Sequence, residues 1–258
     1  MPAITAQNGP MTQTMRTVLK WLAEPAAVLL LAFGATTAIA QPFYVPSGSM
    51  EPTLRIGDAM IASKFTYGYS TASLPAQLGL SGGPRLLARD PRQGDVVIFR
   101  HPENNAMVLV KRVIGLAGDR VQIRGGRLFI NGQMLELENA GMGEAESQQG
   151  AKAAIAQFVE ILPNGVRHPV FKRYWNGITD DTPAIAVPAD YLFVMGDNRD
   201  NSTDSRVAVA DGGVGLVPTA NLIGRAEFVV GSFDFPNMHG PASWPGLFRL
   251  SRFFHKIT

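Results

Sequence analysis

Apolar residues fall into one long run near the N-terminus and many short runs after it. The long run is AAVLLLAFGATTAIA, Ala26 to Ala40, and apolar residues at 21–22 and 43–45 extend it on both sides. Together these segments reach the ~20 residues that a bilayer core requires. We therefore predict one N-terminal transmembrane helix, an anchor over residues 21–42.

The charges around this run predict its orientation. Arg16 and Lys20 lie just before it, and no acidic residue precedes Glu24. Because basic flanks stay in the cytoplasm, we expect residues 1–20 to be cytoplasmic and residues 43–258 to be exported.

A cleaved signal peptide is the alternative interpretation of the same run. It ends in Ala38-Ile39-Ala40, a small-x-small pattern that is followed by Gln41. We prefer a retained anchor, because the serine-bearing loop described below begins soon after Ala40 and its expected chemistry takes place close to the membrane.

The short apolar runs alternate with turn residues and predict strands. We expect strands over residues 59–65, 94–102, 107–123, 191–195 and 223–233. GGRLFINGQ predicts a hairpin, since Arg127 to Ile130 stands between Gly-Gly and Asn-Gly. Residues 70–91 and 139–152 are polar and rich in small residues, and we expect surface loops there. Frequent short strands joined by turns indicate a mainly β fold built on an antiparallel sheet.

Composition narrows the chemistry. The chain has 258 residues, no cysteine, four histidines and a formal net charge of +2. So small a charge gives no reason to expect nucleic acid as a partner. Without cysteine there is no thiolate nucleophile and no disulfide. The histidines do not form a paired spacing such as HxxxH, and we expect no metal site.

The stretch PSGSM, Pro46 to Met50, follows the long apolar run. Its residues are typical of turns, and a plain turn is the simplest interpretation. The alternative is a nucleophilic serine, Ser47 or Ser49. A serine becomes a nucleophile only beside a base.

Two side chains are candidates for that base. His101 is near a predicted core strand, but it lies in a polar turn beside a proline. Lys111 lies in VLVKRVIGL, and an amine buried among apolar side chains has a lowered pKa and can act as a base. Lys111 and Arg112 point to opposite faces of a strand. From this segment alone, an edge strand whose two cations both reach solvent is the simpler interpretation.

The third polar stretch is GDNRDNSTDSR, residues 196–206, which holds more Asp, Asn and Ser than a turn needs. Three of its oxygen-bearing side chains and one beyond it have the spacing of a calcium loop: Asp200, Ser202, Asp204 and Asp211. Ser205, however, occupies the position where such loops need glycine. The other interpretation is a polar shelf, on which Ser202 bonds the Lys111 amine while Asp204 and Arg206 pair to hold the turn.

Four of these segments together resemble a known family. PSGSMEPTL, GDVVIF, KRVIGLAGD and GDNRDNSTDSR look like the four sequence boxes of bacterial signal peptidase I, in the family's order and behind an N-terminal anchor. These are membrane-anchored Ser–Lys proteases that remove signal peptides from exported preproteins. The resemblance covers the anchor and residues 43–123 and 190–232, which it implies form a catalytic β domain. Residues 124–189 lie outside it, and we expect them to form a small β extension.

The resemblance implies a role for each candidate residue. Ser49 would be the nucleophile that forms an acyl-enzyme, and Lys111 the general base. The Ser47 hydroxyl and the Ser49 backbone N–H would form the oxyanion hole, and Ser202 would orient the Lys111 amine. Structural support is implied for Asp204 and Arg206. The walls of the substrate pockets are implied to be Phe43, Val45, Leu54 and Val110.

The resemblance also implies substrates and a location. It implies preproteins cut after Ala-x-Ala sites, contact with membrane lipid, and no metal, organic cofactor or nucleic acid. It implies a single-pass protein of the inner (cytoplasmic) membrane, with its catalytic domain on the outer, periplasmic or extracytoplasmic, face. The tail 233–258 ends in WPGLFRLSRFFHKIT, which either lies on the membrane surface or docks on the β core. Glu51, and Ala117 where proline is frequent, depart from the family's commonest pattern.

Rival classes remain at this point. An anchored β domain that only binds an exported partner would make PSGSM a plain loop and Lys111 a strand residue that reaches solvent. A self-cleaving Ser–Lys repressor shares the dyad, but the anchor argues against it. A Ser–His hydrolase would need His101 beside the serine.

Overall fold

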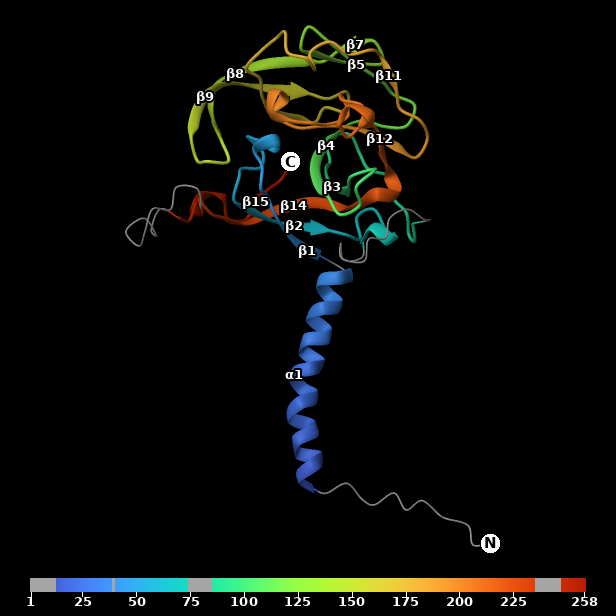
Figure 1. Cartoon of the computed structure of the whole chain (residues 1–258), viewed down its shortest axis with the longest axis vertical. Helices are drawn as coiled ribbons and strands as arrows, with labels where there is room; N and C mark the ends of the chain where they lie inside the picture. Colours follow the sequence, from blue (N-terminus) through green and yellow to red (C-terminus); the bar gives the residue numbers. More distant parts are fainter. Residues whose placement is uncertain (1–12, 39, 74–84, 235–246) are drawn as a thin grey trace.

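The structure is a computed structural model of the chain, and it describes residues 13–38, 40–73, 85–234 and 247–258. Within them, a long helix precedes a body of antiparallel sheets (Figure 1). The prediction of a mainly β, antiparallel fold is confirmed.

The largest sheet carries the candidate residues. Its strands, in spatial order, are β1 (Ala40–Tyr44), β2 (Asp58–Ser63), β14 (Leu222–Ser232), β3 (Val96–Arg100), β4 (Val108–Gly115), β12 (Tyr191–Met195) and β13 (Val217–Pro218). A short strand near the C-terminus, β15 (His255–Lys256), also pairs with β14. Strands far apart in sequence are therefore neighbours, and β4 lies inside the sheet between β3 and β12.

Two smaller sheets are built mostly from the segment 124–189. One contains β11 (Ile185–Ala186), β5 (Arg120–Arg124), β6 (Arg127–Ile130) and β7 (Gln133–Met134). The other contains β10 (Arg167–Phe171), β9 (Lys152–Ile161) and β8 (Glu136–Glu146). In Figure 1 these sheets form the layer farthest from the helix.

The hairpin predicted from GGRLFINGQ is confirmed. Strand β6 pairs with β5 on one side and with β7 on the other. The turn between β6 and β7 places Asn131 at φ 55° and Gly132 at φ 81°. Asn and Gly tolerate this left-handed backbone, which the tightest hairpin turns require.

The loop expected over 139–152 is wrong for most of its length. Strand β8 runs to Glu146 and pairs with β9 as a long hairpin, and only a short turn separates them. Most β8 side chains are exposed or half-buried. Backbone hydrogen bonds to β9 therefore define this strand. Because neither face of it is buried, its sequence lacks the alternation of apolar and polar residues by which a strand is predicted.

Helix α1 (Gln13–Ala38) covers most of the expected anchor. It starts before residue 21, and β1 already begins at Ala40, so the boundaries 21–42 are wrong. Among the residues that the structure describes, no helix has both the length and the apolar character of a membrane crossing.

Apolar side chains cover both faces of the largest sheet. On β3, Val96 and Ile98 belong to one buried cluster, whereas Val97 and Phe99 belong to another. Alternate residues of a strand point to opposite faces. Any side chain in the middle of the neighbouring strand β4 therefore faces protein rather than solvent.

The described end of the tail, residues 247–258, docks on the β core, which is one of the two expectations for it. Arg252 Nε donates to Asp58 Oδ1 (3.0 Å), and Arg252 Nη2 donates to the Thr53 carbonyl (2.9 Å). Contact of the tail with lipid stays a prediction. Residues 74–84 of the expected loop 70–91, and residues 235–246, lie outside the described part of the chain.

Candidate active site

Ser49 sits in a short 3-10 turn, Gly48–Met50, that directly follows β1. Met50, the last residue of the turn, is fully buried in the apolar core and anchors the turn there. The turn is fixed from the side by the Asn198 backbone N–H, which donates to the Ser49 carbonyl (3.1 Å). Ser49 is 9% exposed, so its hydroxyl is held rather than free in solvent.

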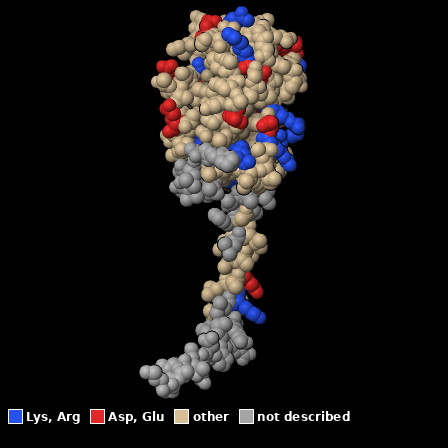
Figure 2. Space-filling model, turned by 90° about the vertical axis from the view of Figure 1, so that its right-hand side faces the viewer, with Lys and Arg blue, Asp and Glu red and all other residues tan. Residues whose placement is uncertain are grey.

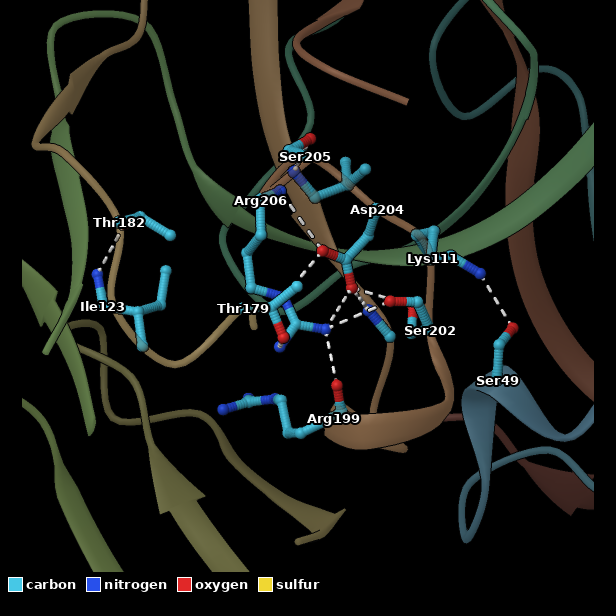
Figure 3. Close-up of polar contacts among 12 residues, drawn as sticks. Ser49, Lys111, Ile123, Thr179, Thr182, Arg199, Ser202, Asp204, Ser205 and Arg206 are labelled. Atoms are coloured by element: carbon cyan, nitrogen blue, oxygen red, sulfur yellow. Dashed lines mark hydrogen bonds and ion pairs between the residues drawn. The ribbon is translucent and has the colours of Figure 1, made fainter. Parts of the chain in front are cut away.

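Lys111 reaches Ser49 from β4. Its Nζ donates to Ser49 Oγ at 2.7 Å, and the two side chains point toward each other in Figure 3. Lys111 is only 3% exposed, and its backbone is opposite Val97 of β3. The sequence places these residues 62 positions apart, and the sheet brings them together.

The surroundings of Lys111 favour its neutral form. Burial lowers the pKa of Lys111 to about 8, while the charges of Asp204 and Asp197 oppose part of this shift. An ammonium loses hydration when buried, so the uncharged amine becomes the stable form at lower pH. At pH 7 roughly one tenth of Lys111 is therefore neutral and able to accept a proton, and this fraction grows as the pH rises toward 8.

The edge-strand interpretation of Lys111 and Arg112 is wrong. Strand β4 is interior, and both cations are buried. Arg112 forms a fork with Asp197, with Nε to Oδ1 at 2.8 Å and Nη2 to Oδ2 at 2.7 Å. Burial raises the pKa of Asp197, but Arg112 outweighs this effect and holds it well below the usual range. Arg112 thus has a structural partner, and only Lys111 faces the serine.

The hydroxyls of Ser47 and Ser202 have different partners. The Ser47 and Ser49 hydroxyl oxygens are 3.4 Å apart. Ser202 donates to Asp204 Oδ2 (2.8 Å), so the hydrogen bond that the structure gives its hydroxyl goes to this carboxylate and not to the lysine. The Asp204 carboxylate favours the charged form of Lys111 and couples the shelf to the amine electrostatically.

Within this shelf, Asp204 and Arg206 form a buried ion pair. Arg206 donates from Nε to Asp204 Oδ1 and from Nη2 to Asp204 Oδ2, both at 2.8 Å (Figure 3). Arg206 Nη2 also donates to the Arg199 carbonyl (2.6 Å). Two parallel bonds fix the carboxylate plane, so this pair holds the loop 196–206 in one conformation.

Gly196 is a functional residue that the sequence pattern did not single out. A Cβ at this position would lie 2.4 Å from the Ser49 carbonyl and 2.3 Å from Ser202 Oγ. Only a residue without a side chain allows the end of β12 to approach the serine turn this closely.

A pocket of about 490 Å³ opens over Ser49 and Lys111. Its apolar lining comes from Ile56 and Leu109, which the sequence analysis missed. Further lining comes from the turn between β8 and β9, at residues 147–149, and from Asn201 and Thr203. The four predicted pocket residues meet in one apolar cluster: Phe43, Val45, Leu54 and Val110.

The structure supports neither His101 as the base nor a calcium loop that begins at Asp200. His101 Nε2 contacts the Gly213 carbonyl (3.2 Å), and its Nδ1 accepts from the Glu103 backbone N–H. Asp200 binds Lys172 (2.5 Å), whereas Asp204 binds Arg206, so the carboxylates of the proposed calcium loop point to different cations. Within the described residues, no group of three or more His, Asp or Glu side chains could hold a metal.

Known proteins match most of the chain. The family model described as "Signal peptidase, peptidase S26" matches residues 18–231. A signal peptidase I of Rickettsia typhi is 36% identical over 230 residues, which cover 86% of this chain and 83% of that protein. A signal peptidase I of Rickettsia akari is 36% identical over 212 residues, which cover 79% and 76%.

A solved structure of a signal peptidase I from Enterococcus faecalis V583 overlaps 53% of this chain and 97% of its own, with 23% identity. Its TM-score of 0.30 is too low to bear on the fold. The match over residues 18–231 includes the serine turn, the lysine strand and the loop 196–206. The chain therefore belongs to the signal peptidase I family, peptidase S26.

Proposed function

We propose that Ser49 and Lys111 are the catalytic dyad with which this chain removes signal peptides from exported preproteins. The single observation that supports this assignment most is the 2.7 Å hydrogen bond between Lys111 Nζ and Ser49 Oγ in a buried setting. As a member of its family, the protein is a signal peptidase, a serine endopeptidase and hydrolase.

In the first half of the reaction, the neutral Lys111 amine accepts the hydroxyl proton of Ser49. Ser49 Oγ attacks the carbonyl carbon of the peptide bond and forms a tetrahedral oxyanion. The Ser49 backbone N–H and the Ser47 hydroxyl donate to this oxygen. The C–N bond then breaks, the Lys111 ammonium gives its proton to the leaving amine, and the signal peptide stays bound to Ser49 as an ester.

In the second half, a water molecule replaces the leaving amine. Neutral Lys111 accepts a proton from this water molecule, and the water oxygen attacks the carbonyl carbon of the ester. The same donors stabilise the second oxyanion. Breaking the ester C–O bond returns the proton to Ser49 Oγ and releases the carboxylate of the signal peptide. These steps need no metal and no organic cofactor.

The shelf positions the base in this mechanism. Ser202 and the ion pair of Asp204 with Arg206 keep a negative charge at a fixed distance from the amine. The proton on Lys111 is stabilised while the tetrahedral intermediate exists, although burial keeps the resting amine partly neutral.

We assign small substrate side chains to the apolar cluster beside the turn. Phe43 of β1 and Val110 of β4 are the half-buried members of this cluster, and Val45 and Leu54 are buried in it. An extended peptide places alternate side chains on the same face. Two alanines of an Ala-x-Ala site would then both lie on this cluster, at its half-buried members Phe43 and Val110.

Membrane attachment through α1 belongs to the same proposal. Large apolar side chains on this helix are exposed, among them Trp21 (78%) and Leu31 (74%). On the face shown in Figure 2, the charged atoms drawn on the helix lie toward its N-terminal end, and the described residues seen between them and the sheets are uncharged. Such a surface is stabilised by lipid, not by water. Residues 1–20 would be cytoplasmic, in a single-pass protein of the inner membrane with the sheets on the extracytoplasmic side.

The proposed division of the chain follows from these roles. Residues 43–123 and 190–232 would form the catalytic β domain, and residues 124–189 its β extension. The tail 233–258 would complete the domain and face the lipid surface.

Cleavage of a preprotein whose signal ends in Ala-x-Ala tests the proposal. The full chain in detergent should cut after the second alanine, and Ser49→Ala should be inactive. Ser251→Ala, at an exposed serine of the tail, is the matched control and should cut like the wild type. Cleavage by Ser49→Ala would contradict the assignment, and an inactive wild type would favour a domain that only binds exported proteins.

A further inference from the structure

Glu51 is a buried carboxylate that the mechanism does not use. It stands two residues after the proposed nucleophile and is only 1% exposed. Buried acidic side chains are uncommon unless they have partners. Its contacts therefore indicate what it does.

The Glu51 carboxylate joins three segments of the chain. Its Oε1 accepts from the Glu146 backbone N–H at 3.1 Å, at the end of β8. Its Oε2 accepts from Asn198 Nδ2 (3.3 Å), in the loop after β12. The carboxylate also lies against its own turn, because a Cβ on Gly48 would be 2.8 Å from Oε2. One side chain thus connects the serine turn to both neighbouring segments.

Glu146 is in turn held from the other side. Arg249 Nη2, from the docked tail, donates to Glu146 Oε2 at 2.9 Å. Arg249 also donates to the Ile56 carbonyl (2.7 Å) and forms an ion pair with Asp234 (3.2 Å). The last residue of β8 is therefore fixed through its backbone by Glu51 and through its side chain by the tail.

The turn that follows Glu146 is part of the active-site pocket. Ser147, Gln148 and Gln149 line the same 490 Å³ space as Ser49 and Lys111. The turn is closed on itself, since the Ser147 backbone N–H donates to the Ala151 carbonyl (2.8 Å). The two glutamines are exposed at its tip, and their amides can both donate to and accept from a peptide backbone.

We propose that Glu51 is a positioning residue that fixes the Ser49 turn against the end of β8, so that Gln148 and Gln149 form a peptide-binding wall of the catalytic pocket. This inference rests on the proposed function, because the wall matters only if Ser49 and Lys111 carry out the reaction. The substrate contacted there is an extended peptide, bound through its backbone amides.

The charges around Glu51 fit a role as an acceptor. The charged groups that face it are Arg55 from the following turn and Glu146 from β8, with Arg249 and Asp234 beyond Glu146. Both of its closest contacts are N–H donors. A neutral side chain with one carbonyl oxygen can keep the bond to the Glu146 N–H, whereas an apolar side chain cannot.

The first test compares Glu51→Leu with Glu51→Gln in the full chain, using the preprotein assay. Glu51→Leu should lower kcat on the order of ten- to hundredfold, because small displacements of a nucleophile have effects of this size. Glu51→Gln should keep most of the activity. Glu144→Gln, at an exposed glutamate of β8, is the control and should match the wild type. Equal kcat for Glu51→Leu and the wild type, or equal losses in both Glu51 variants, would overturn the proposal.

The second test addresses the wall itself. Replacing Gln148 and Gln149 together by alanine should raise KM and leave kcat unchanged, the pattern of lost substrate binding. An unchanged KM would contradict the wall.

The third test measures geometry without relying on activity. The chain has no cysteine, so spin labels can be placed on cysteines at 149, in the turn after β8, and at 201, in the loop after β12, both of which line the pocket. The distance distribution should be narrow in the otherwise wild-type chain and broad with Glu51→Leu. If Glu51→Leu does not fold, Arg249→Gln should broaden it instead, and an unchanged distribution in that variant would overturn the proposal.

Lys111→Met distinguishes a failure of the proposed Ser49–Lys111 dyad from a failure of the proposed role of Glu51. If Lys111→Met cuts the preprotein, the dyad itself is wrong. If Lys111→Met is inactive and Glu51→Leu is normal, only the positioning role of Glu51 fails.

Discussion

Lys111 and Arg112 are neighbours on β4 that are both buried and bind partners on opposite faces of the sheet, Ser49 and Asp197 respectively. We assign Lys111 as the base and Arg112 as a structural residue. Arg112 is matched by a carboxylate, whereas Lys111 meets a hydroxyl and has a pKa that burial lowers.

The pH dependence of cleavage should report the lysine. Only the neutral amine can accept a proton, so kcat/KM should rise with pH and level off above an apparent pKa of about 8. A histidine base would instead give a rise near its usual pKa of ~6.5. Initial rates between pH 5.5 and 9.5, with stability checked at each pH, decide between them. A plateau already reached at pH 7 would contradict a lysine base.

Removing Arg112 should destabilise the fold. Arg112→Met leaves Asp197 buried without its main partner, and breaking such a pair costs about 3–5 kcal/mol. Urea unfolding monitored by circular dichroism measures this loss.

Arg167→Met is the matched control, because Arg167 pairs with Glu138 where both side chains are about half exposed. Exposed pairs contribute little to stability because solvent screens them. Similar losses of unfolding free energy in Arg112→Met and Arg167→Met would show that the buried pair contributes no more to stability than the exposed one.

A methyl group at Gly196 should inactivate the enzyme. In Gly196→Ala the new Cβ would overlap the Ser49 carbonyl, so the serine turn and the end of β12 must separate. We expect kcat to fall on the order of a hundredfold. In Gly34→Ala the methyl meets nothing within 4 Å, and activity should be unchanged. An active Gly196→Ala variant would mean that the turn can move without losing the dyad.

Glu51 should make stability depend on pH. Burial raises the pKa of Glu51 to about 7 from 4.5. Between these values the folded chain holds a proton that the unfolded chain has lost, so the free energy of unfolding falls as pH rises from about 4.5 to about 7.

Glu51→Gln removes this dependence. Its stability relative to the wild type should grow over the same interval, by on the order of 3 kcal/mol. Chemical denaturation of both proteins at pH 5 and pH 8 measures the difference. A constant difference would contradict a raised pKa, and Glu144→Gln controls for the loss of one carboxylate at an exposed position.

Strands with a strong apolar pattern were predictable from the sequence. Tyr191–Met195 forms β12 as expected, and the Asn-Gly turn defines the hairpin of β6 and β7. In both cases local residues decide the local structure. The sequence boxes likewise located Ser49 and Lys111, which the fold brings into contact.

Features that depend on neighbours distant in sequence were not predictable. Strand β8 has few buried side chains, and its pairing with β9 defines it. Whether β4 is an interior or an edge strand depends on β12, which follows it by many residues. Glu51 looked like a departure from a family pattern, and its partners Glu146 and Asn198 become visible only in the folded chain.

The most direct test of the dyad is single-turnover cleavage of the Ala-x-Ala preprotein by Lys111→Met. Methionine nearly matches lysine in length and cannot accept a proton, so the pocket stays filled and only the base is removed. We predict a folded variant whose cleavage rate falls by at least ~10²–10⁴-fold, while His101→Ala cuts at the rate of the wild type. Cleavage by Lys111→Met at the wild-type rate, or its loss in His101→Ala, would contradict the assignment of Lys111 as the base.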